Sequence, residues 1–159
     1  MENVKILDAS LKQLDDILLI QKISNEALLS KSNLENDLKN KMCKYFIAYI
    51  NEEPIAYLGS SYVLDSLDIL SILVNPNYRN KGIATKLIKE LIKFCSSKDI
   101  KTIFLEVRKS NNKAIMLYES FNFTKVSERK NYYKNEDAII YVLNLWNRLR
   151  TFYFVFNIF

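Results

Sequence analysis

Several segments of the chain alternate apolar with polar residues or form short apolar runs, and both patterns are typical of β-strands. Turn-forming sequences such as NEEP, NPNY and KNED separate these runs. Pro76 in NPNY ends one run, because proline cannot donate the hydrogen bond that a central strand requires. The pattern predicts strands at residues 4–10, 43–50, 54–63, 67–74, 101–107, 124–133 and 138–145.

Between these strands, apolar residues recur every three or four positions, which predicts amphipathic helices. Helix starts are indicated by the capping residues Ser10 and Asn111, and by a capping box that runs from Ser32 to Glu35. The pattern predicts helices at residues 11–24, 32–40, 83–95 and 111–120.

The predicted element order is β-α-α-β-β-β-α-β-α-β-β, which is typical of an α/β fold with a mixed sheet and helices on both faces. A chain of 159 residues is long enough for one domain with a real core. We assign this domain to residues 1–145. The aromatic extension at residues 146–159 is expected to be a packing element or a self-association surface, because its aromatic residues would otherwise form an exposed apolar patch.

Composition limits the chemistry that this domain can perform. The chain has no histidine, which excludes Ser-His-Asp and Cys-His catalysis and argues against a zinc site. Cys43 and Cys95 lack metal-ligand spacing and are interpreted as reduced core thiols, so no metal is expected. With no signal-like N-terminus and no apolar segment of about 20 residues, we expect a cytoplasmic protein without membrane contact.

The net charge of +5 fits an anionic ligand or a nucleic acid, although a genome rich in Lys, Asn and Ile codons explains it equally well. A nucleic-acid-binding protein is expected to gather cationic and aromatic residues on one face. Here the lysines are spread over every predicted element, and the aromatic residues mostly occupy apolar strand positions. We therefore expect no nucleic-acid partner.

Gly82 is one of only two glycines in the chain, and it lies where a predicted strand gives way to a helix. The first N–H groups of a helix have no partner within the helix and favour anions, and a glycine lets a phosphate approach the backbone. The pattern Arg79-x-x-Gly82-x-Ala84 therefore indicates a phosphate site. It matches neither a P-loop nor a dinucleotide fingerprint. The alternative is a helix start after a proline turn in which Gly82 is merely tolerated.

A second informative stretch is LEVRKSNNKAIMLYESFNF. Glu106 lies midway along a predicted strand, where a carboxylate is costly unless it is hydrated or used. Tyr118 follows about two turns into the next helix, and a strand–turn–helix path can bring both side chains to one cleft. In the alternative interpretation, Glu106 lies on an exposed sheet face paired with Arg108 or a lysine, and Tyr118 is a core aromatic residue.

These stretches together resemble the GCN5-related N-acetyltransferases. ILVNPNYRNKGIATKLI is similar to that family's acetyl-CoA motif, and LEVRKSNNKAIMLYESFNF with RKNYYKNEDAIIYVL resembles bacterial ribosomal-protein-alanine N-acetyltransferases. The resemblance covers roughly residues 4–145 and implies a mostly antiparallel mixed sheet. It also implies transfer of an acetyl group from acetyl-CoA, without a metal, to the amine of the N-terminal alanine of a small-subunit ribosomal protein.

The resemblance also implies roles for individual residues. Glu106 would be the general base and Tyr118 the general acid in a direct attack on the thioester. Tyr132 and Tyr133 fall where relatives line the peptide entrance. The residues that would bind acetyl-CoA are Ile72, Leu73, Val74, Arg79, Asn80, Lys81, Gly82, Ile83, Ala84, Thr85 and Asn111.

The chain departs from the family pattern between its first two predicted helices. The segment ALLSKSNLENDL lacks the Pro-Trp pair that members usually carry on the acceptor side. An acceptor of another kind, such as a different protein N-terminus, a lysine, a polyamine or a drug, therefore remains an alternative on the same fold.

Overall fold

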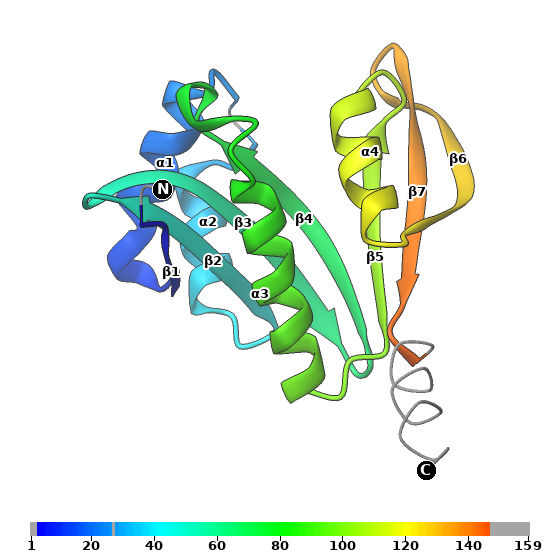
Figure 1. Ribbon diagram of the computed structural model, residues 1–159, viewed down its shortest axis with the longest axis horizontal. Helices are drawn as coiled ribbons and strands as arrows, with labels where there is room; N and C mark the ends of the chain where they lie inside the picture. The colour runs from blue at the N-terminus through cyan, green and yellow to red at the C-terminus, as the bar shows by residue number, and fades with distance from the viewer. Residues whose placement is uncertain (1–2, 27, 147–159) are drawn as a thin grey trace. The chain divides into compact units, whose positions relative to one another are not determined.

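The computed structural model describes residues 3–26 and 28–146, and its elements follow the predicted order (Figure 1). These residues divide into two compact units. The first unit contains the described residues up to 63 together with residues 69–94, and the second contains residues 64–68 and those from 95 onward. Of the predicted extension at residues 146–159, all but Trp146 lies outside the described residues.

The first unit is built on four strands in the order β1-β2-β3-β4. Strands β2 and β3 form an antiparallel hairpin whose turn residues, Asn51 and Glu52, have φ values of 47° and 68°. Positive φ at both central residues is the backbone geometry that matches the twist of a two-residue hairpin. The strands are β1 (Lys5–Asp8), β2 (Cys43–Ile50), β3 (Glu53–Val63) and β4 (Ser66–Val74).

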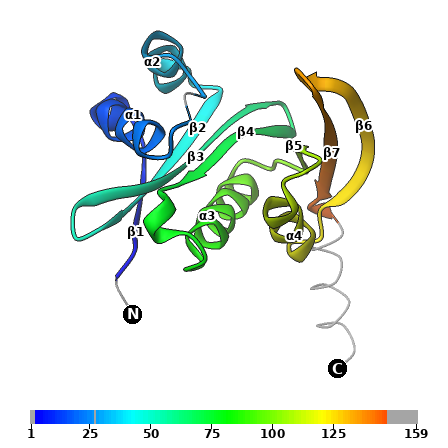
Figure 2. The same cartoon turned by 90° about the horizontal axis from the view of Figure 1, so that it is seen from above.

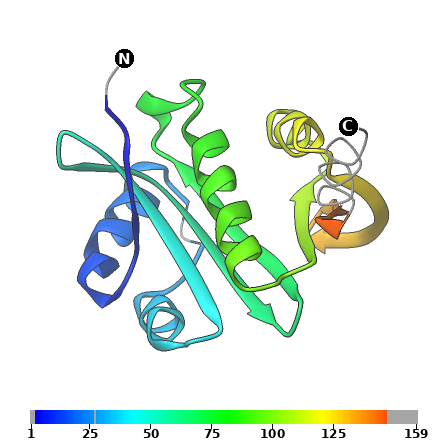
Figure 3. The ribbon, with the colours of Figure 1, turned by 60° about the horizontal axis from the view of Figure 1, so that its bottom comes forward.

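Helices cover both faces of these strands, with α1 and α2 on one side and α3 on the other (Figures 2 and 3). Ser10 caps the first helical segment as predicted and forms a capping box with Gln13. The predicted helix at 11–24 begins as a short 3-10 helix, η1, and continues as α1. The bounds are η1 (Leu11–Gln13), α1 (Leu14–Ile23), α2 (Lys31–Lys39) and α3 (Ile83–Ser97).

The prediction of a Ser32–Glu35 capping box was wrong. Helix α2 starts earlier, and Ser30 is its N-cap, accepting a hydrogen bond from the Asn33 N–H at 3.2 Å. Both serines suit an N-cap, so the sequence pattern alone did not separate them. Glu35 instead forms an ion pair with Lys39, one turn further along the helix.

Alternate side chains of β2 lie on opposite faces of the strands and pack against the helices on each side. Tyr45 and Ile47 pack in one buried cluster with Ile17 and Ile20 of α1 and with Leu34 of α2. On the opposite face, the Phe46 ring meets Phe94 of α3 edge-on, with centroids 6.4 Å apart. The predicted apolar positions therefore form two cores, one on each side of the strands.

The second glycine of the chain has a packing role. A Cβ atom built on Gly59 of β3 would lie only 2.6 Å from the Tyr45 ring carbon Cζ. Because Tyr45 is 2% exposed, its ring has little room to move away. Gly59 is therefore needed to seat a large aromatic side chain in the core.

The second unit contains strands in the order β5-β7-β6, paired antiparallel, with helix α4 on one face. Tyr141 of β7 donates a hydrogen bond to Glu119 of α4 at 2.8 Å, which identifies the face that α4 covers. Leu105 pairs with Tyr141 and shares that face. The elements are β5 (Thr102–Arg108), α4 (Asn112–Ser120), β6 (Thr124–Tyr133) and β7 (Glu136–Asn144).

Candidate active site

The segment between β4 and α3 is shaped by hydrogen bonds from its own side chains. Asn75 is 2% exposed and caps the short helix η2 (Pro76–Tyr78), accepting a hydrogen bond from the Asn77 N–H at 3.0 Å. Arg79 then folds back, and its Nε donates to the Val74 carbonyl at 3.1 Å. Two parts of the predicted acetyl-CoA site, the end of β4 and the Arg79 side chain, are thereby held together.

Gly82 has the conformation that its position requires. Its φ is +73°, in the left-handed region that favours glycine, and α3 begins at the next residue. Apart from Gly82 and its two chain neighbours, no atom of the described chain lies within 4 Å of a Cβ built there, so the backbone at the start of α3 is open to an approaching group. The predicted start of a helix directly after Gly82 is confirmed, whereas phosphate binding stays a prediction.

The side chains of the predicted acetyl-CoA segment differ in exposure. Leu73 and Ile83 are buried and anchor β4 and α3 in the core. The segment between them is presented to solvent, as a loop that approaches a large anion must be. Partly exposed residues are Ile72, Val74, Ala84 and Thr85, and exposed residues are Arg79, Asn80, Lys81 and Gly82.

Lys81 adds positive charge beside this segment. Its ammonium lies 5.0 Å from the centroid of the Tyr78 ring, and the Tyr78 hydroxyl donates to Glu53 at 2.7 Å. A cation over an aromatic face gains a modest electrostatic stabilisation. The Lys81 charge is therefore held near the helix start instead of sampling all of its rotamers.

Glu106 lies on the face of the second unit that is opposite to α4. It pairs with Ile140 on β7, one position away from the Leu105–Tyr141 pair that faces the helix. The Glu106 side chain is 26% exposed, so its carboxylate is partly shielded but still reached by solvent. This is an arrangement in which a carboxylate can exchange protons with an acceptor or a water.

The Glu106 carboxylate is paired with Arg129 of β6. Arg129 Nη1 donates to Glu106 Oε1 at 2.5 Å, and the guanidinium carbon lies 4.4 Å from the centroid of the Tyr132 ring. The alternative interpretation, in which Glu106 pairs with Arg108 or a lysine, was wrong about the partner. Arg108 instead contacts Glu136 at 3.5 Å and stacks on the Tyr133 ring.

Tyr118 lies on α4 and is 8% exposed, with its ring edge-on to Phe123 at a centroid distance of 5.7 Å. Burial, together with a smaller effect of the neighbouring Tyr133, raises the pKa of its hydroxyl to about 12. Tyr118 therefore keeps its proton at physiological pH, as a general acid must. The ring itself is a core residue, so the packing alternative is correct for that part of the side chain.

Tyr132 and Tyr133 connect these groups. The two rings meet edge-on with centroids 5.0 Å apart. A hydrogen bond from the Tyr132 hydroxyl to Glu106, and then the negative charge of Glu106, raise the pKa of Tyr132. Burial and then the Glu106 charge raise the pKa of Tyr133, which in turn acts on Tyr118. Both predicted entrance tyrosines thus interact with Glu106, and Tyr133 also interacts with Tyr118.

A bulge in β6 explains how two consecutive tyrosines reach this cluster. The register of β6 on β7 shifts between Arg129 and Tyr133, and Asn131 has a φ of 52°. A bulge redirects side chains that would otherwise alternate between the two faces of the strand. The sequence run RKNYY gives no period-2 signal from which this could be predicted.

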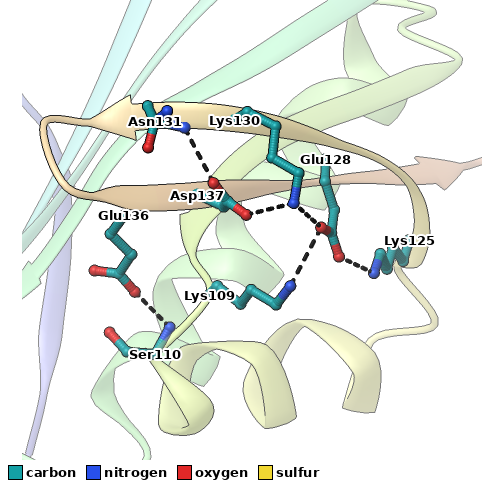
Figure 4. A network of polar contacts seen from close by, with 8 residues as sticks. All are labelled: Lys109, Ser110, Lys125, Glu128, Lys130, Asn131, Glu136 and Asp137. Atoms are coloured by element: carbon teal, nitrogen blue, oxygen red, sulfur yellow. Dashed lines mark hydrogen bonds and ion pairs between the residues drawn. The ribbon is translucent and has the colours of Figure 1, made fainter.

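Ion pairs brace the hairpin that carries the tyrosines (Figure 4). Glu128 accepts from Lys125 at 2.5 Å and from Lys109 at 3.3 Å, while Asp137 accepts from Lys130 at 2.8 Å. At the tip of the hairpin, the Ser110 N–H donates to Glu136 at 2.6 Å, tying it to the segment before α4. The lysines of β6 are therefore largely neutralised within the hairpin.

Among the described residues, no group of three or more Cys, Asp or Glu side chains is arranged to hold a metal ion. No helix in the described part of the chain is both long and apolar enough to span a membrane.

Comparisons with known proteins agree with this architecture. Residues 11–123 match the model of the family described as Acetyltransferase (GNAT) family. Ribosomal protein bS18-alanine N-acetyltransferase of Escherichia coli (strain K12) is 38% identical over 97 residues, which are 58% of this chain and 66% of that protein. The match thus spans just under two thirds of that relative. An N-alpha-acetyltransferase of Saccharolobus solfataricus is 33% identical over 147 residues, covering 84% of this chain and 88% of that protein.

Solved structures show the same fold. The crystal structure of the ribosomal-protein-S18-alanine N-acetyltransferase from Escherichia coli has a TM-score of 0.84 at 29% identity, covering 89% of this chain and 94% of that one. Arabidopsis thaliana NAA60 in complex with acetyl-CoA has a TM-score of 0.81 at 20% identity, covering 90% of this chain and 99% of that one. At this identity the match shows only that the two folds are alike. The predicted α/β fold with a mixed sheet of seven strands is confirmed.

Proposed function

The chain belongs to the GNAT acetyltransferase family, and from this premise we propose that it transfers the acetyl group of acetyl-CoA to the N-terminal α-amino group of a protein. The observation that carries the proposal is the start of α3, where Gly82 at φ +73° opens the backbone beside Arg79 and Lys81. A helix N-terminus of this kind suits the diphosphate of coenzyme A.

In this proposal, residues of β4 and the start of α3 bind the donor, and Glu106 and Tyr118 move protons. Backbone groups of residues 72–74 would bind the acetyl-pantetheine arm, and residues 79–85 the diphosphate. The amide side chain of Asn111 would add a contact. A backbone N–H near Val74 would stabilise the oxyanion of the tetrahedral intermediate. The acetyl donor is a substrate, and no metal is required for this chemistry.

Glu106 would accept the proton that the attacking amine loses, directly or through a water, and Tyr118 would protonate the departing thiolate. The new C–N bond replaces the C–S bond, the amine proton passes to Glu106, and coenzyme A leaves as a thiol with the proton of Tyr118. Proton exchange with solvent then returns Glu106 to the carboxylate and Tyr118 to the phenol. With its pKa raised to about 12, Tyr118 is protonated at physiological pH and has a proton to donate.

An α-amino group is the acceptor that best suits a carboxylate base. With a pKa of about 7.7–8.0, about a fifth to a third of such amines are neutral at pH 7.4, compared with about 0.1% of lysine side chains. The difference corresponds to about 3 kcal/mol of deprotonation. Together with the names of the bacterial relatives, it leads us to propose the N-terminal alanine of a small-subunit ribosomal protein as the acceptor.

The experiment incubates the protein with acetyl-CoA and a panel of peptides that differ only in their first residue, and mass spectrometry locates the added acetyl group. We expect acetylation at the α-amine, fastest with N-terminal alanine, and a loss of turnover in Glu106→Gln and Tyr118→Phe. Wild-type rates in both variants would refute the assignment of base and acid.

The second candidate is an enzyme of the same fold that acetylates a different kind of amine. The missing Pro-Trp pair in residues 27–38 favours including this candidate in the test. N-terminally blocked peptides with a free lysine, polyamines and small drug amines therefore belong in the panel. Faster acetylation of one of these than of every α-amine would replace the proposed acceptor while leaving the acetyl donor unchanged.

A further inference from the structure

Arg129 holds the Glu106 carboxylate through one oxygen. The contact joins Arg129 Nη1 to Glu106 Oε1 at 2.5 Å and is a charge-assisted hydrogen bond with a single donor. The other oxygen, Oε2, has no part in this contact. A carboxylate held in this way is restricted in its rotamer, while its second oxygen stays outside the contact with Arg129.

The register of the sheet makes this contact possible. Arg129 pairs with Ala138 on β7, and Glu106 pairs with Ile140 on the same strand, so both charged side chains lie on one face with β7 between them. Ala138 is fully buried and presents only a methyl group, which lets the long Arg129 side chain cross β7 to reach β5. A larger residue at 138 would lie in its path.

Tyr132 fixes the other end of the contact. Its ring lies under the guanidinium, 4.4 Å from the guanidinium carbon, and Tyr132 also interacts with Glu106. Stacking on an aromatic ring pre-organises the planar guanidinium, so that less freedom is lost when it binds the carboxylate. Arg129 is thus a rigid support for Glu106.

The pair adds little to the stability of the fold. The side chains of Arg129 and Glu106 are 53% and 26% exposed, and ion pairs so accessible to solvent contribute little to folding. The position of a proton-transfer group matters far more for rate, because a misplacement of about 1 Å can lower it about 100-fold. The arrangement is therefore better suited to orienting Glu106 than to holding the sheet together.

We propose that Arg129 is a positioning residue for catalysis, which orients the Glu106 carboxylate toward the acceptor amine while stacked on Tyr132. The inference rests on the proposed function, in which Glu106 is the base. It assigns no contact of Arg129 with acetyl-CoA. Removing the guanidinium should therefore lower kcat and leave the KM for acetyl-CoA nearly unchanged.

The experiment compares the full chain with Arg129→Ala, using acetyl-CoA and the peptide that the wild-type protein acetylates best. We expect kcat to fall about 10- to 100-fold in Arg129→Ala, and the KM for acetyl-CoA to change less than about twofold. Arg129→Lys keeps one cationic donor without the stacked plane, so its kcat should be intermediate. Lys125→Gln, which removes a cation from the same strand, is the matched control and should keep the wild-type kcat.

Chemical rescue separates positioning from a structural role. Guanidinium chloride at about 50 mM, far below the molar concentrations that unfold proteins, should raise the kcat of Arg129→Ala at least about threefold. Sodium chloride at the same ionic strength should not, and neither reagent should rescue an Arg129→Ala variant that also carries Glu106→Gln.

Each result decides between the two proposals. If the wild-type protein is active and the kcat of Arg129→Ala is unchanged or raised, the positioning role of Arg129 is overturned and the proposed function stands. A loss of kcat that guanidinium does not rescue has the same consequence. A wild-type protein that binds no acetyl-CoA and acetylates no amine would instead overturn the proposed function, and the role of Arg129 with it.

Discussion

Asn111 caps helix α4 through Ala114, whose N–H donates a hydrogen bond of 3.2 Å to the side-chain oxygen of Asn111. The sequence predicts this cap, and the resemblance to acetyltransferases gives the same residue a contact with acetyl-CoA. The two roles use different atoms, because the cap occupies Oδ1 and a ligand contact can use the amide nitrogen. They are therefore separable by substitution.

Asn111→Ala should destabilise the protein by about 1 kcal/mol, because the first turn of α4 loses its cap. For a chain of this size, the expected fall in Tm is about 2–4 °C. Asn111→Ser keeps a capping oxygen without the amide nitrogen, so it should melt near the wild-type temperature and bind acetyl-CoA more weakly. Thermal melts and calorimetric titration measure the two effects. Equal acetyl-CoA affinity in Asn111→Ser and wild type would show that Asn111 is a cap only.

Gly82 permits a similar separation of folding from binding. At φ +73°, an alanine is expected to cost about 1–2 kcal/mol, although nothing within 4 Å would obstruct its Cβ. Asparagine tolerates this conformation better, as Asn80 does in this chain at φ 62°. Gly82→Asn should therefore fold almost as stably as wild type and yet bind acetyl-CoA at least about tenfold more weakly, as titration would show. Unchanged affinity in that variant would mean that no ligand approaches the backbone there.

How far the sequence predicts this molecule depends on which interactions are local. The periodicity of residues 83–95 and the cap at Asn111 are local signals, and both elements form where they were predicted. The choice between Ser30 and Ser32 as the α2 cap depends on how that helix packs, so the local pattern favoured the wrong serine.

The contact of Glu106 with Arg129 joins residues 23 positions apart, and it depends on the register of three strands and on a bulge in β6. Periodicity carries no information about register, so the partner of the carboxylate could not be predicted. The same is true of Gly59, whose need for a missing Cβ arises from the Tyr45 ring on the neighbouring strand. The sequence indicated candidate residues for the chemistry, and tertiary structure determined their neighbours.

Tyr118 should contribute to catalysis equally across the physiological pH range. Because burial raises its pKa to about 12, its hydroxyl stays protonated at every pH from 6 to 9. Tyr118→Phe keeps the ring that packs on Phe123 and should lower kcat by about 100-fold at each pH in that range. Tyr141→Phe, which removes a hydroxyl bonded to Glu119 in the same unit, is the matched control. A loss that varies with pH, or no loss at all, would contradict the general-acid role.

Acid should loosen the hairpin formed by β6 and β7. Hydrogen bonds from Lys125 and then Lys109 lower the pKa of Glu128 from its usual 4.5, and a hydrogen bond from Lys130 lowers that of Asp137 from 3.8. A carboxyl group with a lowered pKa in the folded state contributes stability above its unfolded-state pKa, and this contribution is lost as the pH falls through the folded-state value. The loss should therefore begin below about pH 4.5 for Glu128 and below about pH 3.8 for Asp137.

Glu128→Gln tests this directly, because glutamine cannot ionise. The difference in the free energy of unfolding between wild type and Glu128→Gln should be constant from pH 6 to 8 and should shrink as the pH falls from 4.5 to 3. Denaturant unfolding at each pH gives the difference. Since Glu128 is partly exposed and its lysine partners are about half exposed, 1 M sodium chloride should reduce the difference at pH 7. A difference that grows with acid would show that the lysines around Glu128 do not stabilise its ionised form in the folded hairpin.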